Sequence, residues 1–271
     1  MLRISLAIAS FFFVFCAHAQ EMTGARAAAL NNTSVAISDL WSGLSNQAGL
    51  TGVQSFSAGV SFQNRYAVKD LSDKALVIAS PLGIGKIGLS LHSFGNSNYS
   101  DSRLGLAYAM SLNEKFSVGV QLNYHQLRIT EGYGSRQGVS VEIGAIYRMN
   151  EHLLLAAHIA NPTRSALADY RDERRPSVLR MGATYVFSQK VSLLSELIAQ
   201  SEQRVSIKGA LEYQAVENFF IRAGAGSMPS STAFGIGYQF SGWRLDAASS
   251  WHNTLGFSPQ LSLSYIGNAK K

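Results

Sequence analysis

The chain has little charge and almost no cysteine, and both shortages restrict the class of protein. Charged residues make up 15% of the 271 residues, against about 25% in soluble domains, while hydrophobic residues reach an ordinary 46%. The single cysteine, Cys16, lies in the leader described below, so the rest of the chain can form no disulfide. No Lys/Arg run accompanies the formal net charge of +6, and nucleic-acid binding therefore has no support.

The first residues have the pattern of an export signal. Arg3 supplies the positive charge, residues 6–15 form a short apolar core, and a small-x-small cleavage site ends at Ala19. We predict that this signal directs export through the Sec pathway and is cleaved after Ala19. The alternative is lipidation of Cys16, which would need a small residue directly before the cysteine, where bulky Phe15 stands.

After this leader the sequence lacks any run of roughly 20 apolar residues, the length that a transmembrane helix needs. Instead, from about residue 54, apolar residues alternate with polar or small ones, which is the two-residue period of a strand. The clearest examples are residues 116–124, 139–148 and 179–187. Because lipid offers no partner to an unpaired backbone group, a membrane-spanning chain with this pattern has to close into a barrel.

Fourteen such segments can be counted, and an even number is typical of single-chain bacterial barrels. They span residues 54–66, 74–80, 85–94, 102–112, 116–129, 137–149, 152–161, 177–187, 191–201, 204–215, 218–227, 231–240, 243–253 and 258–267. Segments 74–80 and 191–201 alternate poorly, so twelve strands is the alternative count. We predict an all-β fold, a closed antiparallel transmembrane β-barrel of about 14 strands, in contact with lipid of a Gram-negative outer membrane.

Aromatic residues stand at the ends of the apolar faces and not in their middles. Girdles of Tyr and Phe at the level of the lipid headgroups produce this arrangement, whereas a soluble sandwich would bury such residues centrally. The pattern therefore favours a membrane barrel. The residues concerned are Tyr124, Tyr147, Tyr185, Phe187, Tyr213, Tyr238, Phe240 and Tyr265.

The opposite faces of the predicted strands carry charged residues among many Gly, Ala and Ser. We interpret these charges as ion pairs inside the barrel, and a role in transport or proton transfer is the alternative. The sequence shows no nucleophile elbow and no metal-ligand spacing, so we predict no enzyme, cofactor or metal. The predicted lumen-facing residues are Arg65, Arg103, His125, Glu142, Arg148, His158, Arg180, Lys208, Glu212, Arg222, Arg244 and Asp246.

Residues 20–53 do not alternate and are too apolar for a free tail, so we predict that they fold into the barrel as a plug. A short helix is expected near Val35–Trp41. The predicted organisation is a signal peptide at residues 1–19, the plug at 20–53, the barrel at 54–267 and a C-terminal tail at 268–271.

Three stretches of the plug carry a family resemblance: residues 24–30 (GARAAAL), 34–41 (SVAISDLW) and 46–50 (NQAGL). Together they resemble the N-terminal signature of the PorV/PorQ family, which is similar to the FadL-type fatty-acid transporters, fourteen-stranded barrels with an N-terminal hatch. That hatch typically carries an Asn-Pro-Ala-Gly-Leu motif. Here Gln47 replaces the proline, and Asn31-Asn32 stands where a glycine pair is usual.

The resemblance defines a candidate plug motif whose residues we expect to be mainly structural. Its glycines would permit close backbone approach, Arg26 and Asp39 would pair with each other or with lumen charges, and Trp41 would wedge against the wall. Direct contact with a ligand is the alternative role. The motif consists of Gly24, Arg26, Asp39, Trp41, Asn46 and Gly49.

The resemblance implies two functions. The PorV/PorQ likeness implies a type IX secretion-associated or envelope-accessory protein that binds a secretion-system subunit or an exported protein. The charged connection 162–176 is the candidate contact for that role, although its plain interpretation is a solvated loop. The FadL likeness implies instead a passive transporter of small hydrophobic molecules, such as fatty acids, across the outer membrane. The sequence places the first function ahead of the second.

Overall fold

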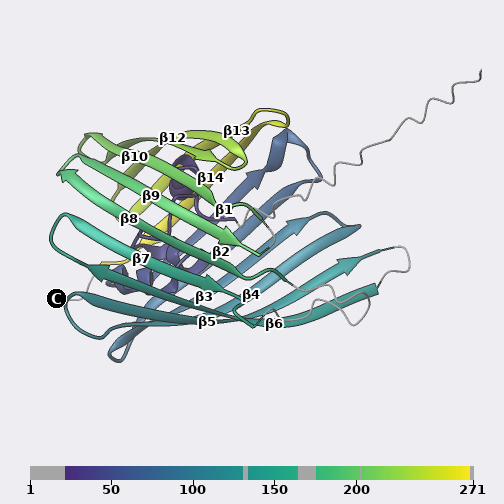
Figure 1. Cartoon of the computed structure of the whole chain (residues 1–271), viewed down its shortest axis with the longest axis horizontal. Coiled ribbons are helices and arrows are strands. Elements are labelled where there is room, and N and C mark those ends of the chain that lie inside the picture. The colour runs from purple at the N-terminus through teal and green to yellow at the C-terminus, as the bar shows by residue number, and fades with distance from the viewer. Residues whose placement is uncertain (1–21, 131–133, 164–174, 202, 269–271) are drawn as a thin grey trace, which may run out of the picture.

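The computed structural model describes residues 22–130, 134–163, 175–201 and 203–268 (Figure 1). Its fourteen strands form one antiparallel sheet in which every strand pairs with its chain neighbours, and β1 pairs with β14 to close the barrel. The predicted fold class is therefore confirmed. Among these residues no helix is long and apolar enough to cross a membrane.

Each predicted segment overlaps one strand, so the twelve-strand alternative is wrong. The strands are β1 (Ser57–Asn64), β2 (Ser72–Leu82), β3 (Gly85–Gly95), β4 (Tyr99–Ser111), β5 (Phe116–Ile129), β6 (Gly134–Arg148), β7 (Leu153–Ala160), β8 (Val178–Ser188), β9 (Val191–Gln200), β10 (Ser206–Val216), β11 (Phe219–Ser227), β12 (Ser230–Phe240), β13 (Trp243–His252) and β14 (Gly256–Ile266).

Strands β2 and β9 alternate poorly for one physical reason: their inward faces are also apolar. Val77 of β2 is fully buried in a cluster with Trp41 and Leu50 of the N-terminal segment. Leu194 of β9 packs in the same way against Leu30. A strand with lipid on one face and an apolar plug on the other needs no polar face.

The two ends of the barrel differ in the length of their connections. At the end that holds the start of β1 and the end of β14, the strands are joined by turns of a few residues, such as 83–84, 217–218 and 241–242. At the opposite end the connection from β7 to β8 spans residues 161–177. Since short turns are periplasmic and longer loops extracellular in bacterial barrels, we place the start of β1 and the end of β14 at the periplasmic end.

The outer wall is an apolar belt edged by aromatic residues. In β5 the outward side chains of Val120 and Leu122 are 50% and 54% exposed, while Gln121 between them is buried. Tyr147, Tyr185, Tyr213, Tyr238 and Tyr265 lie near the periplasmic turns, and Tyr124 lies at the other edge. The predicted aromatic girdle is confirmed.

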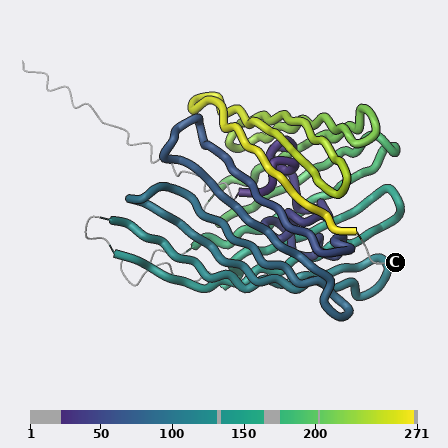
Figure 2. The backbone as a smooth tube through the Cα atoms, turned by 180° about the vertical axis from the view of Figure 1, so that it is seen from behind, coloured from purple at the N-terminus to yellow at the C-terminus, as the bar shows by residue number. Residues whose placement is uncertain are grey.

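The N-terminal segment lies inside the barrel, where Figure 2 shows it in purple between the walls. It contains the α-helix α1 (Ala25–Ala29) and the 3₁₀ helices η1 (Leu40–Leu44) and η2 (Gln47–Gly52). A third 3₁₀ turn, η3 (Arg65–Ala67), belongs to the connection between β1 and β2. Residues 22–53 are called the plug below.

The predicted helix near Val35–Trp41 is misplaced. Residues 35–39 are not helical, and η1 begins only at Leu40 because the Asp39 carboxylate accepts a hydrogen bond from the backbone N–H of Trp41 and caps the helix. The α-helix lies instead in the alanine-rich start of the plug, Ala25–Ala29, where helix propensity is highest.

The depth of the belt can be tested with one charge placed at two heights. Leu122→Lys puts an ammonium at the middle of the lipid-facing wall, whereas Gln137→Lys puts it on the outward face of β6 beyond the belt. We expect Leu122→Lys to lower the free energy of unfolding by about 2–4 kcal/mol and Gln137→Lys to leave it nearly unchanged. Urea unfolding in lipid vesicles measures both, and equal losses would contradict this placement of the belt.

The plugged lumen as candidate functional site

The plug crosses the lumen from one wall to the other. Its start lies against β12, β13 and β14, where the backbone N–H of Ala25 donates to Ser262 Oγ at 3.2 Å. Its middle meets β8, where Thr184 Oγ1 donates to the carbonyl of Ala36 at 3.0 Å. Its end packs on β2, β3 and β4 around Leu50, which is fully buried. The described plug therefore blocks the barrel along its width.

The first anchor of the plug is Glu212 of β10. Its carboxylate receives a bidentate pair from the Arg26 guanidinium, with Nη2–Oε1 at 2.6 Å and Nε–Oε2 at 2.9 Å. Arg26 Nη1 also contacts Asp39 Oδ2 at 2.9 Å, which ties two parts of the plug together. Burial alone would lower the pKa of Arg26, but the carboxylates of Glu212 and Asp39 raise it above its ordinary value.

The second anchor is Glu196 of β9, which holds the plug by its backbone. Oε2 accepts hydrogen bonds from the N–H groups of Ser34 and Val35 at 2.8 and 2.9 Å. Oε1 accepts one from Arg180 Nε at 2.7 Å, and Arg180 Nη2 donates to Ser34 Oγ. A fully buried carboxylate is tolerable here because each oxygen has charged or N–H donors.

The third anchor is Glu142 of β6. Oε2 accepts from Gln47 Nε2 of the plug at 2.8 Å and lies 3.1 Å from His158 Nε2. Oε1 accepts from Asn123 Nδ2 at 2.8 Å and from Arg103 Nη1 at 3.2 Å. Gln47 occupies the position at which the resemblance expects proline, and proline has no donor that could reach this carboxylate.

The remaining motif residues maintain the internal packing of the plug. A Cβ at Gly24 would overlap the Trp41 ring, and one at Gly49 would overlap the side chain of Ser42. The Asn46 side chain accepts from the N–H of Ala48 at 3.2 Å and donates to the carbonyl of Val35 at 2.7 Å. These contacts lie within the plug, and a mainly structural role for the motif stays a prediction.

Asn31 and Asn32 adopt the left-handed conformation, with φ of 54° and 57°. Glycine reaches this region most easily, and Asn tolerates it better than other residues. The Asn pair therefore has the backbone geometry that the usual glycine pair would supply. Asn32 Oδ1 also accepts from Thr23 Oγ1, and Asn31 Oδ1 accepts from Ser231 Oγ of β12 at 3.1 Å.

Most predicted lumen charges meet in the clusters described above. Arg222 joins Glu212 to Asp246, at 2.5 and 2.8 Å, and Asp246 also pairs with Arg244. Lys208 faces inward on β10, and His125 Nε2 contacts Ser140 Oγ at 2.8 Å. Arg65 follows β1 in η3 and pairs with Asp73.

One predicted lumen residue lies elsewhere: Arg148 is the last residue of β6 and is exposed to solvent at the periplasmic end. Sequence reasoning also missed Glu196, Asp73 and His92, the last of which contacts Asp73 at 2.9 Å. The two carboxylates lie in the strands that alternate poorly. A single carboxylate inside an otherwise apolar run was the signal that could have identified Glu196, whereas Asp73 stands between Ser72 and Lys74 and carries no such signal.

The extracellular mouth carries an apolar patch on its inner side. Leu127 and Ile129 continue the inward face of β5 beyond His125, and Ile129 lies opposite Tyr99 of β4. The Phe94 ring of β3 contacts the Tyr99 ring, with centroids 6.2 Å apart. Phe94, Tyr99, Leu127 and Ile129 are called the mouth patch below.

The charged connection 162–176 falls mostly outside the described residues, which resume at Arg175. There, Arg175 Nη2 contacts Asp101 Oδ1 at 3.1 Å, and the carbonyl of Arg175 accepts from Asn161 Nδ2. Within the described part of the chain, no group of three or more His, Cys, Asp or Glu side chains is arranged to hold a metal ion.

Comparison with known proteins adds a fold but no family. No family model and no curated protein matches the chain. Solved barrels do match: the Ralstonia pickettii toluene transporter TbuX has a TM-score of 0.70 at 13% identity, covering 92% of this chain and 99% of that one. The Pseudomonas putida toluene transporter TodX matches with a TM-score of 0.66 at 12% sequence identity, covering 90% of this chain and 96% of that one. A Pseudomonas aeruginosa FadL homologue matches with a TM-score of 0.66 at 11% sequence identity, covering 90% of this chain and 98% of that one.

These similarities show that the chain has the barrel fold of FadL-like channels, as the broader part of the resemblance implied. Identities this low establish the fold alone. The narrower likeness to PorV/PorQ is not shown by them.

If Glu196 anchors the plug, the conservative substitution Glu196→Gln should lower the stability of the protein strongly. Glu196→Gln would remove the buried carboxylate that pairs with Arg180 and would weaken the acceptor of two plug N–H groups. We expect a loss of about 3–5 kcal/mol in the free energy of unfolding, together with faster cleavage of the plug by added protease. Glu217→Gln, at an exposed turn, is the control, and equal protease protection of all three proteins would contradict the role.

Gln47 allows a test of its side chain separate from its backbone. Gln47 is the first residue of η2, a position that accepts proline without loss of a helical hydrogen bond. We therefore expect Gln47→Pro to fold and to lose only the bond to Glu142, about 1–3 kcal/mol. Gln47→Glu should be worse, because it places a second carboxylate beside Glu142. Urea titration of both variants measures the order, and the reverse order would disprove this account.

Proposed function

We propose that the protein is an outer-membrane channel for passive uptake of small hydrophobic molecules, closed at rest by its own N-terminal plug. The observation that carries this proposal is the plug itself. A fourteen-stranded barrel is wider than its inward side chains can fill, and here residues 22–53 occupy the space. If the plug moves, a path opens through the barrel, and the plug then acts as a gate.

The mouth patch is the evidence that the transported molecule is hydrophobic. Apolar side chains on the inner side of an aqueous mouth are expensive to hydrate unless something covers them. Arg65 covers the Phe94 ring, with its guanidinium carbon 4.5 Å from the ring centroid, whereas Tyr99, Leu127 and Ile129 are partly exposed on the inward side of the strand ends. The lumen below is lined by the charged anchors, so a ligand can pass only if the plug moves. Toluene transporters among the structural neighbours fit this ligand class.

The comparisons favour uptake over the secretion-associated role that the sequence placed first. None of the three structural neighbours described above carries a secretion function in its name. The candidate contact for a secretion-system subunit or exported protein, 162–176, lies mostly outside the described residues. Uptake of small hydrophobic molecules therefore takes first place, and an envelope-accessory role takes second.

A disulfide between plug and wall tests whether plug movement opens the path. Ala25 and Ser262 are in direct contact, with Ala25 N and Ser262 Oγ 3.2 Å apart, so the double variant Ala25→Cys/Ser262→Cys is the cross-link to introduce. The native Cys16 lies in the predicted leader and would not interfere. In cells without their own hydrophobic channels, uptake of labelled toluene and oleate should fall to background when the variant is oxidised and recover on reduction.

Single-cysteine variants serve as controls, because they should transport in both redox states. Undiminished uptake by the oxidised double variant would show that the plug does not gate the path. Background uptake by the unmodified protein would overturn the uptake proposal itself. Stoichiometric co-purification of another envelope protein in that case would favour the accessory role.

A further inference from the structure

The strands β3 to β6 extend toward the extracellular side (Figure 1), and their ends lie past the apolar belt. The last belt row across these strands is Leu91, Leu104, Tyr124 and Val139, which are register partners. Two further rows of outward-facing residues follow it, and both are polar. Those strands therefore present a hydrophilic outer face directly above the lipid tails.

The composition of these two rows is unusual for a wall that borders lipid. The lower row is Lys74, Ser93, Ser102, Gln126 and Gln137, each opposite the next. The upper row continues through Ser100, Arg128 and Ser135. Both rows contain hydroxyl, amide and cationic groups but no carboxylate. The nearest acid on these strands, Asp101, has the opposite parity and pairs with Arg175 on the inner side.

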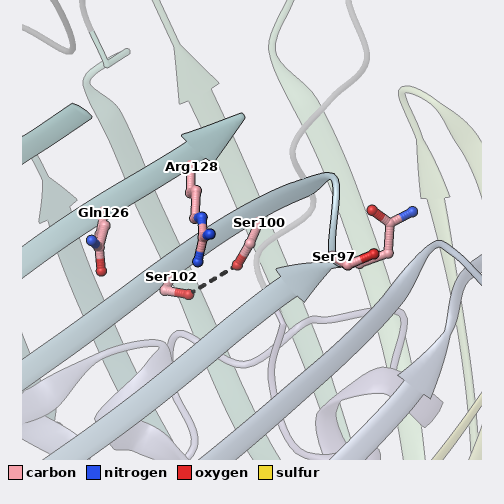
Figure 3. A pocket seen from close by; sticks show the side chains of 6 residues that line it. Ser97, Ser100, Ser102, Gln126 and Arg128 are labelled. Atoms are coloured by element: carbon pink, nitrogen blue, oxygen red, sulfur yellow. Dashed lines mark hydrogen bonds between the residues drawn. The ribbon is translucent and has the colours of Figure 1, made fainter. Parts of the chain in front are cut away.

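A pocket of about 300 Å³ opens in this outer face (Figure 3). The described residues that line it all have polar side chains: Asn96, Ser97, Ser100, Ser102, Gln126 and Arg128. The hydroxyls of Ser100 and Ser102 lie 3.4 Å apart, and Ser102 Oγ donates to Ser93 Oγ at 3.3 Å. The volume reaches the lower end of the range that holds small ligands, roughly 300–1,000 Å³.

Arg128 supplies the charge of this pocket. Among the described residues no carboxylate lines the pocket, and the Arg128 guanidinium has no hydrogen-bond or ion-pair partner there. A guanidinium flanked by hydroxyls and amides is suited to a phosphate ester next to sugar hydroxyls, because it offers a planar fork of donors to the phosphate.

The position of the pocket indicates that such a ligand would be a lipid headgroup and not a free molecule on the uptake route. The pocket opens sideways, on the outside of the barrel, one row above the end of the belt. The headgroup of a neighbouring outer-leaflet lipid lies at this height, whereas the uptake route begins on the inner side of the same strands at the mouth patch. We propose that this pocket binds the phosphorylated saccharide headgroup of the outer-leaflet glycolipid, with Arg128 on the phosphate and Ser100, Ser102 and Gln126 on the sugar hydroxyls.

Glycolipid binding can be measured by native mass spectrometry of the protein released from nanodiscs. The probes are lipopolysaccharide with its core sugars, the same lipid after enzymatic removal of its phosphates, and phosphatidylglycerol. We expect Arg128→Gln to weaken binding of the intact glycolipid about tenfold, the effect of one lost charge-assisted hydrogen bond. Dephosphorylation of the glycolipid should weaken binding to the unmodified protein by a similar factor.

Arg148→Gln is the matched control, because it removes an exposed arginine from the periplasmic end of the same wall. It should leave glycolipid binding unchanged. A second variant, Ser102→Phe, fills the pocket while keeping Arg128 and should also weaken binding. The proposal is overturned if Arg128→Gln and Ser102→Phe bind the glycolipid like the unmodified protein. It is equally overturned if phosphatidylglycerol binds as tightly as the glycolipid, since the sugar would then have no part in recognition.

Discussion

Lipid offers no hydrogen-bond partner to a backbone N–H or C=O, and the rest of this structure depends on that constraint. The chain meets it by pairing β1 with β14, so that no strand edge is left in the membrane. Closing fourteen strands fixes a circumference, and that circumference encloses more space than inward side chains can fill. The plug follows from the closure: without it the apolar inner faces of β2 and β9 would meet water.

Apolar packing buries the plug, and three wall glutamates at separate points around the barrel fix its position. Glu212, Glu196 and Glu142 hold a guanidinium, two backbone N–H groups and a side-chain amide of the plug. Buried ion pairs contribute little net stability because desolvation offsets their attraction, but a broken pair is costly. Such anchors therefore fix one position of the plug without binding it irreversibly. That combination suits the movable closure that we propose for the plug.

The wall has two kinds of outer surface. Over most of its height it is a belt of exposed Val, Leu and Ile edged by aromatic side chains, as a lipid-facing surface requires. Along β3 to β6 it then becomes polar within a single register step, from Leu104 to Ser102 and from Tyr124 to Gln126. The inner side of the same strand ends carries the mouth patch. The extended ends of β3 to β6 thus have a polar outer face suited to lipid headgroups and an inner face, the mouth patch, suited to apolar ligands.

The sequence by itself determined the barrel and which residues face lipid, because a two-residue period is local and needs no knowledge of distant contacts. It left twelve or fourteen strands open, and the structure decided in favour of fourteen. The sequence also located the plug, and it identified Arg26, Glu142 and Glu212 as candidate charges. Only the tertiary structure decided which charges meet. Gln47 and Glu142 are separated by 95 residues, and Ser34 and Glu196 by 162. Their pairing depends on how the plug crosses the lumen, and no periodicity along the chain encodes that path. The position of the helices in the plug escaped the sequence for the same reason, since the wall packing and the Asp39 cap, not a repeating pattern, decide where each one begins.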